Sequence, residues 1–262
     1  MNDSFALHLD NHLCSLRAVV SSLPAVQVLP VMSKDALAFR LKKALEEGRV
    51  LDANRMFWTD QAVTFEAWTS ITAFRLSEHI ESSMHLKALG HFLAAAAVCR
   101  SALEAAVVAL RISASASKVM NSLDVRSLTG GLCFSRTLPD DLDMALYGTR
   151  LKEKQALGSP TQKNVLTYLQ QLSKHPMAGN LVKEYEYLCD LTHPNWLSNR
   201  PFYTTDPQGS IQTVSKEYDQ SWAIATRQLL DVVTSWSAKA TCNVAEQATK
   251  AITHARSVIG AA

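Results

Sequence analysis

The densest group of chemically capable side chains lies between residues 185 and 195, in the segment Tyr-Glu-Tyr-Leu-Cys-Asp-Leu-Thr-His-Pro-Asn. Within it, His193 stands directly before Pro194, and a proline disfavours the helical conformation at the residue that precedes it. We therefore expect a helix to end at His193. Because the C-terminus of a helix carries partial negative charge, it attracts a cationic imidazole, and His193 is a candidate acid or base.

The same segment also has a purely structural interpretation. Asn195 can bond a neighbouring backbone group and form a turn, and His193 and Asn195 together can form a helix cap that fixes the chain after it. Caps are common in proteins and catalytic sites are few. Asp190 is the nearest carboxylate in the segment and is a candidate member of the site. The residues alone leave both interpretations open.

A second polar pair interrupts an apolar segment. Arg100 and Glu104 are four residues apart, so they share one face of a helix. A buried charge that is not paired costs several kcal/mol. The pair therefore predicts either an internal salt bridge, between these two residues or from Arg100 to Asp190 or Glu186, or a polar pocket that Arg100 shares with His193.

A third group of candidates is a helix stripe formed by Glu78, Glu81 and His85. A di-iron bundle site would need a second Glu-x-x-His on another helix, and we find none in the sequence. The sequence also lacks a phosphate-binding loop, a dinucleotide-binding glycine motif and a Gly-x-Ser-x-Gly elbow. We expect neither a metal nor a cofactor, and we keep a metal-dependent bundle enzyme only as an alternative.

The elements that must position these residues are predicted to be helices, because the 262 residues include only 9 glycines and 8 prolines. A long tract from Thr59 to about Ser117 is expected to break at Gly90 or at Ser82-Ser83, and Ser113 to Ser117 is expected to be irregular. Two of the other expected helices cover residues 3–20 and 33–47, and Ser33 is expected to cap the second. Further helices are expected in a short segment closed by Gly148, in a segment capped by Thr161, in a segment after a break at His175-Pro176 that ends at 193, and over 215–259.

Two features set the predicted architecture. The segment from Phe92 to Ile112 is rich in alanine and apolar on nearly every face, which is typical of the central helix of a bundle. Residues 202–214 read as two short strands around Asp206-Pro207-Gln208-Gly209. We predict an all-α, multi-helix bundle with a long central apolar helix and one small β-hairpin. We expect residues 1–57 to be an N-terminal helical extension and 58–262 to be the bundle.

Charge and cysteine content narrow the function classes. The 26 basic and 24 acidic residues leave a net charge of +2, and the basic runs are short, so nonspecific duplex binding is not favoured. Five scattered cysteines without a zinc pair favour reduced thiols and a cytoplasmic protein. Cys14 and Cys99 lie in apolar helical patterns and are expected in the core.

No membrane is expected as a partner. The N-terminus lacks a basic segment that leads into an apolar run, so we expect no signal peptide. The longest apolar stretch, Phe92 to Val98, is expected to be too short to span a bilayer.

Three blocks of the sequence together resemble a group of uncharacterised bacterial helical proteins. The most specific block has the pattern Tyr-x-x-Leu-[Ser/Cys]-[Asp/Glu]-x-x-His-Pro-Asn and ends at Asn195. The other two are Cys99 to Ala105 and Leu146 to Arg150. The resemblance spans roughly residues 85 to 215, and the group is distantly similar to HEPN-type helical domains.

HEPN-type domains are implicated in RNA cleavage, toxin–antitoxin pairs and phage defence. Their usual site is an arginine and a histidine a few residues apart on one helix, and dimerisation brings two copies together. This chain departs from that pattern, since Arg75 and His79 come closest and are one residue too near. A HEPN-like site in this chain therefore requires Arg100 and His193 to meet from different helices.

The resemblance implies a metal-independent RNase, with RNA as substrate and a homodimer or another protein as partner. His193 would act on the ribose 2′-hydroxyl, Arg100 would stabilise the charged phosphorane, and Asn195 and Glu104 would orient the site. The rival interpretation is a non-enzymatic helical module that binds a partner protein or forms a scaffold. The near-neutral charge and the missing HEPN spacing support that rival.

Overall fold

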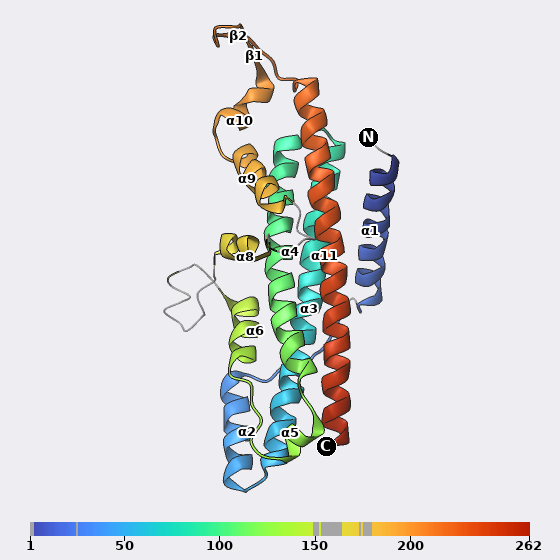
Figure 1. Ribbon diagram of the computed structural model, residues 1–262, viewed down its shortest axis with the longest axis vertical. Coiled ribbons are helices and arrows are strands. Elements are labelled where there is room, and N and C mark those ends of the chain that lie inside the picture. Colours follow the sequence, from blue (N-terminus) through green and yellow to red (C-terminus); the bar gives the residue numbers. More distant parts are fainter. Residues whose placement is uncertain (1–2, 25, 149–151, 153–163, 173, 175–179) are drawn as a thin grey trace. The chain divides into compact units, whose positions relative to one another are not determined.

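The computed structural model describes residues 3–24, 26–148, 152, 164–172, 174 and 180–262 (Figure 1). Apart from turns and links, the described chain is helical except for one antiparallel hairpin formed by β1 (Tyr203–Thr205) and β2 (Ile211–Val214). The predicted all-α class, the long apolar helix and the hairpin near residues 202–214 are therefore confirmed.

The chain divides into two compact units, each defined by the contacts among its own residues. Unit 1 comprises residues 1–20, 74–108 and 165–242, and unit 2 comprises residues 21–73, 109–164 and 243–262. Three long helices supply residues to both units, namely α3 (Val50–Ala88), α4 (Phe92–Asn121) and α11 (Gln220–Ala261). The segment 1–57, expected to form one extension, is divided between the two units.

Unit 1 is built around the first half of α4. Its other elements are α1 (Asp3–Ser22), α8 (Val165–Leu172), α9 (Leu181–Thr192), α10 (Trp196–Asn199), the 3-10 helix η2 (Arg200–Phe202) and the hairpin. The small side chains of Ala95, Ala96 and Cys99 are fully buried, among larger side chains from α8, α9 and α11. Small residues let neighbouring helices approach closely, which explains why the alanine-rich segment is the core of this unit.

Unit 2 contains α2 (Lys34–Glu46), α5 (Val125–Thr129) and α6 (Thr137–Tyr147), together with parts of the long helices. Ser33 caps α2, as predicted, because its hydroxyl accepts a hydrogen bond from the Ala36 N–H at 3.2 Å. The segment around α5 is fixed by Asn54, which is fully buried on α3. Its Nδ2 donates to the carbonyls of Leu128 and Gly131 at 2.8 and 2.7 Å, and its Oδ1 accepts from the Cys133 N–H at 2.9 Å.

Several predicted helix boundaries need correction. The predicted break at Gly90 is confirmed, since α3 and α4 are separated there and Gly90 has a φ of +79°, which favours glycine. However, α3 begins at Val50 rather than at Thr59. Residues 113–117 are not irregular, because α4 continues to Asn121. Alanine is the strongest helix former, and Ser113, Ala116 and Ser117 are buried within unit 2.

The last helix also begins later than predicted. It begins at Gln220 rather than at Ser215. The side chain of Asp219 accepts a hydrogen bond from the Trp222 N–H at 2.9 Å, and this cap sets the start of the helix. The predicted cap at Thr161 and the predicted break at His175-Pro176 lie outside the described residues.

One of the described helices, α4, is long and apolar enough to cross a membrane by length and composition alone. Its most apolar 18-residue window has a mean hydropathy of 1.8, and 44% of that window is buried in the protein. The stretch Phe92 to Val98, expected to be too short to span a bilayer, is therefore only the start of this longer helix. The core helix of a soluble protein has the same length and composition, so this single helix does not identify a membrane protein.

The cysteines divide by burial. Cys99 is buried as predicted, whereas the prediction that Cys14 lies in the core is wrong because Cys14 is exposed. The buried stripe of α1 consists of Leu9, Leu13 and Leu16. Cys14 follows Leu13 directly, so it lies about 100° around the helix from Leu13 and farther still from Leu9 and Leu16.

We expect this difference to control thiol reactivity. The thiolate is the reactive form of cysteine, and burial raises the pKa of the Cys99 thiol to about 12. Iodoacetamide at about pH 8 should therefore alkylate Cys14 in the native protein, while Cys99 should react only after denaturation. Peptide mass spectrometry of both samples measures this. Native alkylation of Cys99 at the rate of Cys14 would contradict the described packing.

Candidate functional site

His193 lies where the proline predicts. Helix α9 ends at Thr192, and His193 follows in an extended conformation with a ψ of 148°. Its backbone N–H donates to the Cys189 carbonyl at 3.0 Å and closes the last turn of the helix. Its side chain is exposed, and the imidazole makes no hydrogen bond with the part of the chain that the structure describes. The ring is thus open to a ligand.

The inward face of α9 is formed by residues spaced three and four positions apart. Leu181, Tyr185 and Leu188 are between 0% and 6% exposed, and Thr192 continues the same spacing of three and four residues. His193 is the next residue, so it lies about 100° away from this inward face. This spacing was the signal that could have identified Tyr185 and Thr192, which our sequence reasoning did not include among the site residues.

Within unit 1, α9 lies beside α4 (Figure 1). Side chains on the inward face of α9 bond the polar pair on α4. The Nε of Arg100 donates to Glu104 Oε1 at 3.0 Å, and its Nη1 donates to Thr192 Oγ1 at 3.1 Å. The Tyr185 hydroxyl donates to the same Glu104 oxygen at 2.9 Å. The guanidinium carbon of Arg100 lies 5.7 Å from the centre of the Tyr185 ring. We call these four residues, Arg100, Glu104, Tyr185 and Thr192, the Arg100 cluster.

The cluster has a defined protonation pattern. Burial, and then the hydrogen bond to Glu104, raise the pKa of the Tyr185 phenol. Tyr185 therefore stays neutral at neutral pH and acts as a donor to the Glu104 carboxylate. The Thr192 hydroxyl accepts from Arg100 and donates its hydrogen to the Cys189 carbonyl at 3.0 Å.

The Arg100 cluster remains reachable from solvent. The side chains of Arg100 and Glu104 are 28% and 33% exposed. Within the described residues, Arg100 Nη2 and Glu104 Oε2 have no hydrogen-bond partner. A guanidinium held at Nε by a carboxylate and at Nη1 by a hydroxyl can offer its other N–H groups to an oxyanion such as a phosphate.

Asp190 and Asn195 form a separate group at the turn after α9. The Asn195 side chain accepts hydrogen bonds from the N–H groups of Leu197 and Ser198 at 3.0 and 3.2 Å, and it begins α10 with a full capping box. Its Nδ2 donates to Asp190 Oδ1 at 3.2 Å. These two residues hold the turn that carries His193. Among the described contacts, Arg100 forms an ion pair with Glu104 and none with Asp190 or Glu186.

The stripe considered for a metal has a surface role instead. Glu81 pairs with Arg17 at 3.5 Å, and both side chains are more than half exposed. Across the part of the chain that the structure describes, no three His, Cys, Asp or Glu side chains lie close enough to hold a metal ion.

Comparisons of this chain with models of protein families, with curated proteins and with solved structures gave no match. The candidate site therefore rests on the chemistry and geometry of the residues themselves.

Proposed function

We propose that this protein is a cytoplasmic, HEPN-like ribonuclease that cleaves RNA without a metal, in a toxin or phage-defence role. One observation carries the proposal. The guanidinium of Arg100 donates to Thr192, the residue directly before the exposed His193, although Arg100 and Thr192 are 92 positions apart in the chain. Arg100 on α4 is thus joined to the end of α9 that presents His193, and this supports the proposed pairing of an arginine and a histidine from different helices.

The proposed reaction is an internal transfer on the phosphodiester. His193 takes the proton of a ribose 2′-hydroxyl, the 2′-oxygen forms a bond to phosphorus, and the bond from phosphorus to the 5′-oxygen breaks. The products are a 2′,3′-cyclic phosphate and a 5′-hydroxyl that takes a proton from water. The free N–H groups of Arg100 would stabilise the charged phosphorane, Glu104 would orient Arg100, and Asn195 with Asp190 would hold the turn that presents His193.

The test is a cleavage assay on single-stranded RNA in the presence of a chelator. We expect the wild-type protein to release fragments with cyclic phosphate ends. His193→Ala should lower the rate at least about 100-fold, which is the contribution of a general acid or base. His91→Ala is the matched control, because His91 is also an exposed histidine of unit 1, and it should keep the wild-type rate.

A stability measurement distinguishes this proposal from a scaffold. Because His193 is exposed, His193→Ala should change the free energy of unfolding by less than about 0.5 kcal/mol. A lost activity at unchanged stability supports a catalytic histidine. RNA that stays intact with the wild-type protein, or a rate that His193→Ala leaves unchanged, would end the ribonuclease proposal.

The scaffold remains a second candidate because of the Arg100 cluster itself. Arg100, Glu104, Tyr185 and Thr192 bond one another and join α4 to α9. If the protein is a helical module that binds a partner protein or a second copy, this cluster serves only to fix α9. In that case Arg100→Ala should lower stability, and no variant should change an RNA assay.

A further inference from the structure

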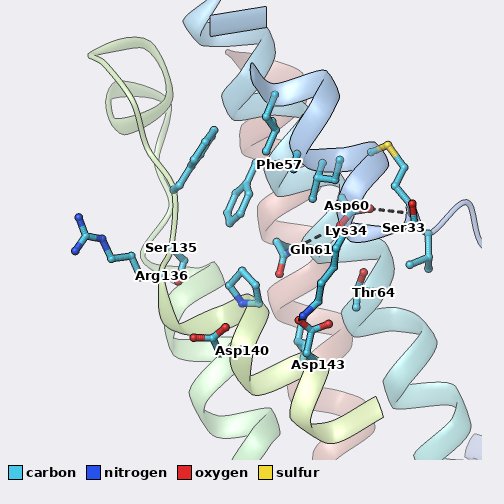
Figure 2. Close-up of a pocket in the computed structure, with 18 of the residues that line it drawn as sticks. Ser33, Lys34, Phe57, Asp60, Gln61, Thr64, Ser135, Arg136, Asp140 and Asp143 are labelled. Atoms are coloured by element: carbon cyan, nitrogen blue, oxygen red, sulfur yellow. Dashed lines mark hydrogen bonds and ion pairs between the residues drawn. The ribbon is translucent and has the colours of Figure 1, made fainter. Parts of the chain in front are cut away.

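Unit 2 contains a cavity of about 890 Å³ that the ribonuclease proposal does not use. It lies between the start of α2, the first half of α3 and the segment from Leu132 to Tyr147 (Figure 2). Small-molecule sites in proteins commonly have volumes of about 300–1,000 Å³. The cavity is therefore large enough for a small organic ligand.

Two buried polar residues line the cavity side by side on α3. Asp60 is 5% exposed and Gln61 is 4% exposed. The Asp60 carboxylate accepts from the Met32 N–H at 3.1 Å and, weakly, from Gln61 Nε2 at 3.4 Å. Burial raises the pKa of Asp60 above its ordinary value. Because burial disfavours the ionised form of this carboxylate, a cationic partner would stabilise it.

The side-chain oxygen of Gln61 gives the more specific evidence for a ligand. Gln61 Oε1 is buried and has no hydrogen-bond partner among the residues that the structure describes. Buried polar atoms are normally paired, so an unpaired acceptor in a cavity wall needs an explanation. A ligand that donates an N–H to this oxygen would supply one.

The remaining walls define the shape and charge of that ligand. The rings of Phe57 and Phe134 stack with centres 4.7 Å apart and offer an aromatic surface. Lys34 pairs with Asp143 at 2.5 Å, so its charge is already neutralised. The guanidinium of Arg136 points away from the other labelled side chains (Figure 2).

We propose that this cavity binds a small aromatic cation of the arylamidine or arylamine class. Its N–H groups donate to Gln61 Oε1 and to the Asp60 carboxylate, and its ring lies against Phe57 and Phe134. The proposal concerns unit 2 alone and does not depend on ribonuclease activity.

Benzamidine and benzamide are the probes, because they share a ring and differ in charge and in the number of N–H donors. Isothermal titration calorimetry on the full chain should show saturable binding of benzamidine. Benzamide should bind at least about tenfold more weakly, since it cannot neutralise Asp60.

Three variants locate the binding. Asp60→Asn and Gln61→Met should each weaken benzamidine binding at least about tenfold. Asp35→Asn removes an exposed carboxylate of unit 2 that is not among the residues lining the cavity, and it should keep the wild-type affinity to within about twofold. Circular dichroism verifies folding. If Asp60→Asn fails to fold, Gln61→Met decides, since methionine keeps the volume and removes an unpaired buried acceptor.

The outcomes separate cleanly. Saturable benzamidine binding that is weakened by Gln61→Met and preserved in Asp35→Asn supports the site. No saturation up to about 10 mM, where the binding free energy is too small for a built site, would overturn the proposal. Equal binding of benzamide, or an affinity that Gln61→Met leaves unchanged, would also overturn it.

Discussion

Replacing Lys87 with methionine is expected to lower the free energy of unfolding by about 3–5 kcal/mol, because it leaves a buried carboxylate without its counter-ion. Lys87 on α3 forms an ion pair with Asp231 on α11, and the Asp231 side chain is only 3% exposed. Methionine keeps most of the length and apolar stem of lysine, so the change removes the charge and little of the packing. Chemical denaturation followed by far-UV circular dichroism measures the loss.

A second substitution tests whether the loss arises from the unpaired charge. Lys87→Met combined with Asp231→Leu removes both partners, and it should recover most of the stability that the single variant loses. Lys250→Met is the matched control, since Lys250 pairs with Glu246 on the protein surface, where the two side chains are 71% and 63% exposed. That control should change stability by less than about 1 kcal/mol.

The ion-pair prediction has a clear contrary result. A loss below about 1 kcal/mol in Lys87→Met would mean that Asp231 reaches water once its partner is gone. A double variant no more stable than Lys87→Met would mean that the carboxylate is required for other contacts. In either case the packing of α3 against α11 in unit 1 would differ from the one described.

The sequence predicts the parts of this fold that depend on local chemistry. The cap at Ser33, the break at Gly90 and the helix end before Pro194 each follow from the conformational preference of one residue. The salt bridge of Arg100 with Glu104 follows from a spacing of four on one helix. Each of these features needs no knowledge of what lies opposite in the folded chain.

The contacts between side chains and groups far apart in the chain, in the candidate site and in unit 2, are of another kind. Tyr185 meets Glu104 across 81 positions of the chain, and Asn54 bonds three backbone groups that lie 74 to 79 positions away. Every residue has a backbone carbonyl, so the residue types do not indicate which carbonyl accepts a hydrogen bond from a distant side chain. The inward face of α9 was readable from its spacing, but its partner on α4 was not.

The same contrast separates the roles within the site. The side chains of the Arg100 cluster form hydrogen bonds with one another, whereas the imidazole of His193 has no hydrogen bond among the described residues. Substitution of a residue that makes few packing contacts and lies at a capped turn changes the free energy of unfolding only slightly. His193 is therefore the position where a change of activity can be separated from a change of stability, and Arg100 is not.

Replacing Asn54 with aspartate is the other change for which we expect a large loss, of about 3–5 kcal/mol at neutral pH. The two side chains have the same shape, but aspartate offers a carboxylate oxygen where Nδ2 now donates to two carbonyls, at 2.7 and 2.8 Å. Asn54 is fully buried, so the new charge would face two carbonyl oxygens without water. The segment around α5 would lose its attachment to α3.

The loss should depend on pH with a defined sign. Repulsion and burial would raise the pKa of an aspartate at position 54 above its value of about 3.9 in the unfolded chain. The folded state would then hold the proton more tightly than the unfolded state, so stability would fall as the pH rises from about 4. Protonation also restores one donor. The difference between Asn54→Asp and the wild-type protein should therefore be smaller at about pH 4 than at about pH 7.

Asn11→Asp provides the control, because it makes the same chemical change at an exposed position of α1. It should alter the free energy of unfolding by less than about 0.5 kcal/mol at either pH. If Asn54→Asp instead unfolds with the wild-type midpoint, water must reach position 54. If its loss is equally large at both pH values, the lost donor geometry, rather than the buried charge, would account for the loss.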